Sequence, residues 1–277
     1  MNMEVKTEDK RNNIVITFCS TKGGVGKSTK TANIGGLLAD LNYKVLLIDG
    51  DPQASLSSHF NITEKSEGGL TNLVRNDSDP LDAISKTDIH NLDIALSNDP
   101  DKELETWIAA RPAGRTTLKN LTIESLRPHY DFILIDSIGA DSPLQHTTVL
   151  AADLLVSPIP PDILSAREFK RGTLGMIEMI EALAPIGQLY GFINRMANTN
   201  DSKLFAKELT SETFAESKSK VRILNTVIPD LVIYKRAATQ KVPVHRLDNR
   251  AKGHMCELIS EILPHLSAEC EAFVEGK

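Results

Sequence analysis

The feature that most constrains the fold of this chain is a glycine-rich stretch, residues 21–28, which reads TKGGVGKS. It follows a β-rich apolar run at residues 14–19 and precedes an amphipathic helical pattern at residues 28–41. In that setting the backbone N–H groups of the turn and the helix N-terminus converge on phosphate oxygens. We therefore expect a phosphate-binding loop in which Lys27 reaches the terminal phosphates and the Ser28 hydroxyl ligates Mg²⁺.

Short apolar runs and longer helical patterns alternate along the rest of the chain. This alternation predicts a mainly parallel sheet flanked by helices on both faces, a doubly wound α/β fold. Ligands in such folds lie beyond the carboxyl ends of the strands. We expect a flexible tail at residues 1–13 and a single domain at residues 14–277. The predicted strands are 14–19, 44–48, 92–95, 132–135, 154–157 and 189–193, and the predicted helices are 28–41, 101–110, 115–126, 143–151, 163–183, 201–217 and 250–266.

Composition narrows the class of protein. No segment approaches the roughly 18 uninterrupted apolar residues that a membrane span needs, so we expect a soluble, cytoplasmic protein. The three cysteines, Cys19, Cys256 and Cys270, are odd in number and show no CxxC spacing, which suits neither a disulfide framework nor an iron–sulfur site. The net charge of −6 excludes a wholly basic nucleic-acid binder, so any DNA contact requires a local basic patch.

Carboxylates follow two further apolar runs. Asp49 and Asp51 come after residues 44–48, and Asp136 ends the run FILI at residues 132–135. An acid at the end of a buried strand beside a phosphate loop can orient Mg²⁺ through its water shell, and we assign that role to Asp136. Read without the loop, Asp49 and Asp51 would fit an ordinary turn equally well, and an apolar run ending in an acid is common.

Two of these boxes resemble a known family. KGGVGKS resembles the deviant Walker A box of the ParA and MinD superfamily of P-loop ATPases, and LLIDGDPQ at residues 46–53 resembles the LLIDxDPQ box of ParA proteins. The resemblance implies a P-loop NTPase fold, ATP and Mg²⁺ as cofactors, and catalysis by Lys27 in cis, Lys22 in trans across a dimer, and Asp51 through the attacking water. It implies nucleotide contacts from Lys22, Gly23, Gly24, Val25, Gly26, Lys27, Ser28 and Thr29, and metal contacts from Ser28, Asp49 and Asp136.

The chain departs from the family pattern after Asp136. Two prolines usually follow that acid in relatives, whereas this chain reads Ser137-Ile138-Gly139-Ala140. In relatives the segment after this acid is the switch that senses the γ-phosphate. The difference in sequence therefore affects what the resemblance implies about that switch.

A base pocket is predicted from two later segments. GFINR at residues 191–195 resembles a strand end of MinD relatives, and its Asn194 amide can read the adenine edge, although a plain strand-terminating asparagine is the alternative. TVIP at residues 226–229 resembles a segment that borders the base in ParA proteins, which makes Pro229 a second candidate. Asp230 follows where relatives commonly carry an arginine that contacts DNA.

Positive charge gathers in the last third of the chain. Residues 195–252 hold twelve Lys or Arg against six Asp or Glu. This asymmetry fits a stripe that binds DNA by charge and without sequence preference, and a solvated surface with scattered lysines is the alternative. The candidate DNA contacts are Lys235, Arg236, Lys241, Arg246 and Arg250.

Together these features predict a DNA-partition ATPase. The resemblance implies an ATP-bound homodimer on nonspecific DNA at the nucleoid, and slow hydrolysis stimulated by a ParB-like partner. The C-terminal segment 256–277 carries glutamates rather than the basic face of a membrane anchor, so we expect no membrane partner. Three alternatives remain: an ATPase that positions a protein complex, a biosynthetic or metal-transfer enzyme, which should need clustered Cys or His, and an inactive scaffold, which the intact loop opposes.

Overall fold

The computed structural model describes residues 13–210 and 221–276. Its strands carry the β-rich runs expected from the sequence, with additional short strands at one edge. They are β1 (Ile14–Phe18), β2 (Val45–Gly50), β3 (Ile62–Glu64), β4 (Ser85–Thr87), β5 (Leu92–Ala95), β6 (Phe132–Ser137), β7 (Leu154–Ile159), β8 (Gln188–Met196) and β9 (Val221–Pro229).

Helices fill most of the connections between these strands. Two of them include wide π turns, at Leu118–Ile123 before α4 and at Phe169–Thr173 between α6 and α7, so each pair of segments reads as one longer helix in the sequence. The helices are α1 (Lys27–Asp40), α2 (Leu70–Arg75), α3 (Glu103–Ala109), α4 (Glu124–Leu126), α5 (Pro143–Ala151), α6 (Ile163–Glu168), α7 (Leu174–Glu181), α8 (Asn200–Leu209), α10 (Ile233–Gln240), α11 (Asn249–Ile262) and α12 (Ser267–Glu275).

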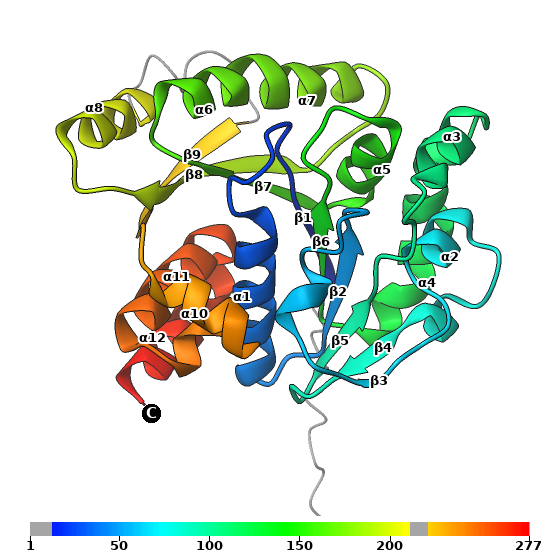
Figure 1. Ribbon diagram of the computed structural model, residues 1–277, viewed down its shortest axis with the longest axis horizontal. Helices are drawn as coiled ribbons and strands as arrows, with labels where there is room; N and C mark the ends of the chain where they lie inside the picture. Colours follow the sequence, from blue (N-terminus) through cyan, green and yellow to red (C-terminus); the bar gives the residue numbers. More distant parts are fainter. Residues whose placement is uncertain (1–12, 211–220, 277) are drawn as a thin grey trace, which may run out of the picture.

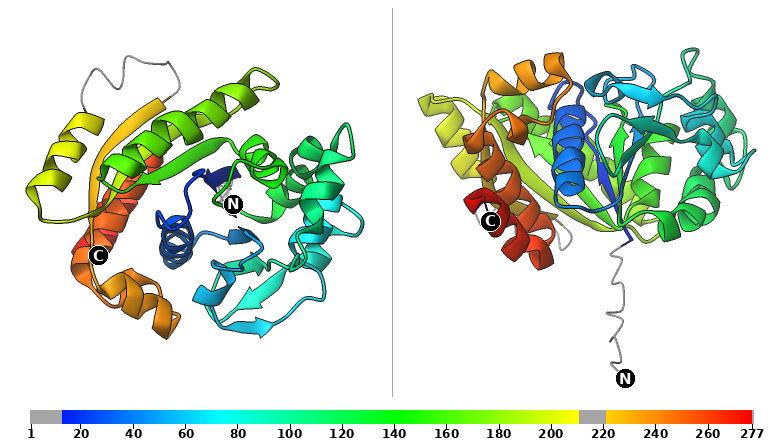
Figure 2. Two further views of the ribbon diagram at one scale, coloured as in Figure 1. Left: turned by 45° about the horizontal axis from the view of Figure 1, so that its top comes forward. Right: turned by 90° about the horizontal axis from the view of Figure 1, so that it is seen from below.

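The strands form one sheet in the order β3-β4-β5-β2-β6-β1-β7-β8-β9 (Figure 1). From β5 to β9 all neighbours are parallel, whereas β3 and β4 add an antiparallel edge. Figure 2 shows α1 against one face of the curved sheet and α6 and α7 against the other. The predicted doubly wound, mainly parallel α/β sheet is therefore confirmed.

The period-2 alternation of each strand divides the core between the two faces. In β2, Val45 and Leu47 pack with α1 and the helices α10–α12, whereas Leu46 and Ile48 pack with α2, α3 and α4 on the opposite face. Both sets are fully buried. A central strand that is apolar on both sides needs helices on both sides, and this requirement accounts for the continuous apolar runs seen in the sequence.

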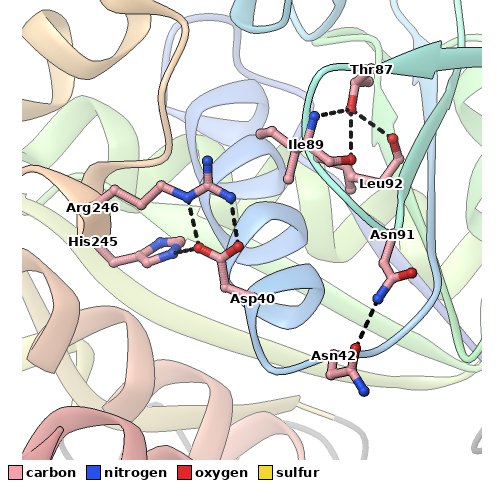
Figure 3. Close-up of polar contacts among 8 residues, drawn as sticks. All are labelled: Asp40, Asn42, Thr87, Ile89, Asn91, Leu92, His245 and Arg246. Carbon is pink, nitrogen blue, oxygen red and sulfur yellow. Dashed lines mark hydrogen bonds and ion pairs between the residues drawn. The ribbon is translucent and has the colours of Figure 1, made fainter.

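The far end of α1 is tied to the C-terminal helices by a cluster around Asp40, the last residue of the helix (Figure 3). Arg246 binds the Asp40 carboxylate with Nε at 2.7 Å from Oδ2 and Nη2 at 2.6 Å from Oδ1. His245 Nε2 lies 2.7 Å from the same Oδ2. Burial acts to raise the pKa of Asp40, but the hydrogen bonds from Arg246 and His245 outweigh it and hold that pKa well below its usual range. Nearby, Asn91 donates to Asn42 and so joins two loops of the same end.

This cluster bears on one expectation from the sequence. Arg246 was a candidate DNA contact, yet its guanidinium forms a bidentate ion pair with Asp40. An arginine held in this way positions the chain and has two of its nitrogens already occupied. We therefore leave Arg246 out of the basic surface that is discussed below.

Replacing Asp40 by asparagine should lower the free energy of unfolding at neutral pH by about 1–3 kcal/mol, because the three hydrogen bonds to its carboxylate are weakened or lost. The pKa of Asp40 is depressed in the folded chain. The stabilisation by the Asp40 carboxylate is thus fully present above a pH of about 3.9, the pKa of an aspartate in the unfolded chain. It is lost as the pH falls toward the lower pKa of Asp40 in the folded chain. Denaturant unfolding of both proteins across pH should show the difference narrowing in acid.

Asp101→Asn is the matched control, since Asp101 is exposed ahead of α3. It should leave the unfolding free energy within about 0.5 kcal/mol of wild type at each pH. An Asp40→Asn protein as stable as this control at neutral pH would contradict the role assigned to the cluster.

Candidate functional site

The glycine-rich loop between β1 and α1 is held in shape by the end of β8. Gly24 (φ 73°) and Gly26 (φ 99°) adopt left-handed conformations that favour glycine. Asn194 Nδ2 donates to the Val25 carbonyl oxygen at 2.8 Å, and Arg195 Nη1 donates to that of Gly24 at 2.7 Å. A Cβ on Gly26 would lie 2.6 Å from Asn194 Nδ2, so the position requires glycine for space as well as for conformation.

The loop opens into a pocket of about 560 Å³ at the N-terminus of α1. That helix has no side-chain cap, which leaves its first N–H groups directed at the pocket. Lys27 lines the pocket and is only 6% exposed; burial lowers its pKa, and the nearby Asp136 and Asp51 carboxylates oppose that effect. The other lining residues include Gly23, Gly24, Gly26, Ser28, Thr29, Gln53, Ser55, Ser58, His59, Lys102, Gly139 and Arg195.

Parallel register brings two of the predicted acids together at the ends of their strands, close to Lys27 and Ser28. Asp49 on β2 lies opposite Asp136 on β6, and Asp136 in turn lies opposite Phe18, the last residue of β1. Within the described residues neither carboxylate oxygen of Asp136 has a hydrogen-bond partner, although both are buried. Burial raises the pKa of Asp136 to about 8, with Asp49 adding to the rise, while the nearby Ser28 hydroxyl and Lys27 favour its charged form.

These groups fit a magnesium ion. Mg²⁺ prefers oxygen ligands, keeps several waters and needs only one or two carboxylates. An unpaired buried carboxylate at Asp136 and the hydroxyl of Ser28 supply that donor set beside the phosphate pocket. A bound cation would also remove the unfavourable burial of the Asp136 charge.

Asp49 has a second task in the structure. Its Oδ2 accepts from the Ser57 amide at 2.7 Å and from the Ser57 hydroxyl at 2.6 Å, and its Oδ1 accepts from the Asp51 amide at 3.3 Å. Burial raises its pKa to about 6 against these bonds. In this conformation Asp49 fixes the loop that carries Asp51, and its part in metal binding stays a prediction.

Asp51 lies at the pocket wall, as the sequence predicted. It is half-buried, and its Oδ1 accepts from the Gln53 amide at 2.9 Å, which orients the carboxylate within the turn. The placement puts a carboxylate on the same side of the loop as Lys27 and Ser28. Its action on a water molecule remains a prediction.

Lys22 points away from the pocket that its own loop forms. Its Nζ donates to the Ser165 hydroxyl at 2.8 Å and lies 3.9 Å from Asp162, the N-cap residue of α6. About a third of the Lys22 side chain is exposed. The two lysines of the loop are thus directed to different places: Lys27 to the pocket, Lys22 to the surface at α6.

A second pocket of about 140 Å³ lies on the other side of the loop, where Gly26 and Thr29 border both pockets. Asn194 and Pro229, the two predicted base contacts, both line it. Asn194 is 1% exposed; its Nδ2 donates to the loop, whereas its Oδ1 is buried and has no partner in the part of the chain that the structure describes. The structure therefore brings these two residues together, and adenine binding by them remains a prediction.

Some residues at the two pockets were not expected from the sequence. Gly139 touches the loop: a Cβ there would lie 2.8 Å from Gly23 Cα and 3.2 Å from Lys27 Nζ. Lys30, on α1, is buried at the base pocket, and Arg195 borders both pockets. A lysine directly after the loop and a glycine after Asp136 were visible in the sequence, but neither falls in a recognised motif.

The remaining DNA candidates lie at the surface of the C-terminal helices. Lys235 and Arg236 are exposed on α10, Lys241 is half-buried just after that helix, and Arg250 is exposed in the first turn of α11. Within the described parts of the chain none of the four forms an ion pair. Residues 211–217 of the predicted helix 201–217 and the basic residues 218 and 220 lie outside the described residues, as do residues 1–12 of the predicted tail.

Comparison with known proteins matches a family model described as an AAA domain at residues 13–189. The chain is 30% identical to the virulence plasmid ParA family protein pGP5-D of Chlamydia psittaci, over 68% of this chain and 72% of that protein. It is 28% identical to maintenance of carboxysome distribution protein A of Synechococcus elongatus, over 84% and 92%. The apo structure of McdA from Cyanothece superposes with a TM-score of 0.78 at 26% identity, covering 90% of this chain and 99% of that one.

Two searches of the described residues add to these comparisons. None of the helices in residues 13–210 and 221–276 has the length and apolar character that crossing a membrane requires. In the same residues no group of three or more His, Cys, Asp or Glu side chains is placed to hold a metal ion.

Gly139→Ala should weaken Mg·ATP binding by on the order of tenfold, because the new methyl group would push the loop at Gly23 and the Lys27 ammonium out of position. Isothermal titration calorimetry with a non-hydrolysable ATP analogue measures the effect, and thermal denaturation checks that the variant is folded. Gly175→Ala is the control, because a Cβ at that helical position meets nothing within 4 Å and should leave binding unchanged. Equal affinities for the two variants would show that Gly139 does not shape the loop.

Proposed function

Because this chain belongs to the ParA family of P-loop ATPases, we propose that it is a DNA-partition ATPase that works as a nucleotide-controlled switch. In this proposal, Mg·ATP brings two chains face to face, the dimer binds duplex DNA without sequence preference, and hydrolysis releases it. The observation that carries the proposal is that the two lysines of the loop point in different directions. Lys27 is buried at its own phosphate pocket, whereas Lys22 lies outside that pocket and contacts Ser165 at the surface of α6.

Each residue of the site has a task in hydrolysis. Lys27 and the N–H groups of the loop bind the terminal phosphates, and Asp51 aims a water molecule at the γ-phosphate from the pocket wall. Ser28 and Asp136 hold Mg²⁺, which neutralises charge on the phosphate oxygens. Phosphoryl transfer of this kind depends on positioning and charge stabilisation, so the contribution of Lys22 from the second chain completes the site only in the dimer.

The same arrangement explains why hydrolysis should be slow in the absence of a partner. Lys22 is held by Ser165 and Asp162 at α6, and these contacts must break before the side chain reaches another nucleotide. We propose that a ParB-like DNA-binding protein acts as the activator. The protein would then work in the cytoplasm, on the nucleoid in the ATP state and away from it in the ADP state.

The DNA surface in this proposal consists of Lys235, Arg236, Lys241 and Arg250. All four are carried by α10, α11 and the segment between them, so they share one end of the molecule (Figure 1). Their charges are not neutralised by ion pairs within the described residues, and side chains of this kind bind phosphates by releasing counterions. Asp230 lies at the start of the same region and reduces its net charge.

A second candidate is an ATPase that positions a protein complex. The similarity to carboxysome distribution protein A and the superposition on McdA favour it, since these relatives cover nearly the whole chain. The two functions share the ATP switch and differ in what is moved. Binding to DNA alone does not separate them, so the identity of the activating partner is the discriminating observation.

Duplex DNA of random sequence should bind the protein with Mg·ATP, and bind much less with ADP or without nucleotide. Fluorescence anisotropy across a salt series should show affinity falling steeply as salt rises. Lys22→Ala should bind ATP with near wild-type affinity and lose dimerisation and DNA binding, because it removes only the contact made across the dimer. DNA binding by this variant at wild-type strength would refute the trans role of Lys22.

Reversing two charges on α10, Lys235→Glu with Arg236→Glu, should reduce DNA affinity by at least about tenfold and lower the salt dependence, because two phosphate contacts become repulsive. Arg115→Glu with Lys119→Glu makes the same charge change beside α4, at the far end of the sheet, and is the control (Figure 1). ATP binding should be unchanged in both. Equal loss of DNA binding in both double variants would show that net charge, and not the α10 surface, governs binding.

A further inference from the structure

Lys30 is a buried charged side chain that the proposed mechanism does not use. It lies on α1 two residues after Ser28 and is 2% exposed. Its ammonium sits 3.6 Å from the centre of the Tyr234 ring, on α10. Within residues 13–210 and 221–276 that ammonium makes no hydrogen bond. A lysine has three donors, and burying them without an acceptor is unfavourable.

The groups around Lys30 compensate little of the charge of its buried ammonium. Burial, with a smaller contribution from the neighbouring Arg195, lowers the pKa of Lys30 to about 7, and Asp230 opposes both effects. A cation over an aromatic ring is attracted to the ring face, but this does not replace the lost hydrogen bonds to water. A buried cation with so little internal compensation is more readily explained by a ligand than by stability of the chain.

The pocket beside Lys30 contains a second unsatisfied polar group. Asn194 Oδ1 is buried without a partner and is an acceptor, whereas Lys30 Nζ is a donor. Pro229, Leu231 and Tyr234 supply apolar surface in the same pocket of about 140 Å³. Gly26 and Thr29 border both this pocket and the phosphate pocket, so one ligand can span the two.

An adenine base fits this pair of groups. Its edge presents an exocyclic amino donor next to ring nitrogens that accept hydrogen bonds. We propose that Lys30 is a base-reading residue whose ammonium donates to a ring nitrogen of the adenine of bound ATP, while Asn194 Oδ1 accepts from the amino group. This inference rests on the proposed ATP binding and adds a specificity-determining residue to it. Tyr234 is then a positioning residue, because its ring face holds the Lys30 ammonium at the pocket.

Lys30→Met tests the inference because methionine keeps the length and apolar stem of lysine and removes the donors. Binding of Mg·ATP, measured by calorimetry at one pH, should weaken by about tenfold, the loss expected for one hydrogen bond from a charged donor. Binding of magnesium tripolyphosphate, which has no base, should be unchanged. The unliganded variant should melt at the same temperature as wild type or higher, since it no longer buries an uncompensated charge.

The melting temperature separates this role from a structural one. If Lys30 served only to stabilise α1 or α10, its loss would lower the melting temperature and weaken ATP and tripolyphosphate alike, and that outcome would overturn the inference. Lys65→Met is the control, because Lys65 is exposed after β3 and remote from both pockets. Tyr234→Leu removes the ring face under the Lys30 ammonium and should weaken ATP binding as Lys30→Met does.

Deaza analogues of ATP locate the contact on the base. One of the analogues 1-deaza-, 3-deaza- and 7-deaza-ATP lacks the ring nitrogen that Lys30 contacts, and it should bind the wild-type protein about tenfold more weakly than ATP does. The Lys30→Met protein has no such contact, so it should bind that analogue and ATP with equal affinity. If no analogue behaves in this way, the base contact is wrong. A protein that binds ATP with this pattern but never binds DNA would retain the inference and lose the partition function, so the two failures are distinguishable.

Discussion

The parallel pairing of β1, β2 and β6 is the constraint on which the site depends. In this register the ends of the three strands meet, so the loop after Phe18 and the carboxylates of Asp49 and Asp136 share one edge of the sheet. A slip of one residue in β6 would turn Asp136 to the opposite face and bring an apolar neighbour to the phosphate pocket. Burial on both faces prevents such a slip, because Ile133 and Ile135 pack on one side and Leu134 on the other.

Three charged side chains are buried together around the glycine-rich loop. Lys27, Lys30 and Asp136 are almost fully buried there, and neither carboxylate oxygen of Asp136 has a hydrogen-bond partner among the described residues. Such groups oppose folding, so their presence together indicates a site prepared for charged and polar ligands rather than for stability. At the other end of α1 the half-buried carboxylate of Asp40 accepts hydrogen bonds at both oxygens, as expected for a residue whose task is structural.

The sequence was most informative where the signal is local. The glycine-rich loop is eight residues long, and the strand at 132–135 is apolar throughout, so their positions follow from the pattern. The segments β3 and β4 were missed because three residues are too few to show a period, and β9 because a register shift interrupts its alternation. The short helices α2 and α10 also went unrecognised, as did α12, which the sequence analysis treated as an acidic tail.

Contacts between distant residues could not be anticipated in the same way. The burial of Lys30 depends on Tyr234, and the pairing of Arg246 depends on Asp40. Both partners lie more than 200 positions away in the chain. Arg246, which was expected to contact DNA, pairs with Asp40. Lys30 lines a pocket. Only the packing of α10 and the segment after it against α1 reveals this.

The double attachment of α1 has a mechanical consequence. This helix begins in the phosphate loop and is fourteen residues long, so it forms a rod of about 21 Å. Near its start Lys30 touches Tyr234, and at its far end Asp40 binds Arg246. Because α1 is attached at two points to the C-terminal segments, it moves together with them as a rigid body. Any shift of the loop on filling or emptying the pocket is therefore passed to α10 and to the segment after it, which contact this helix.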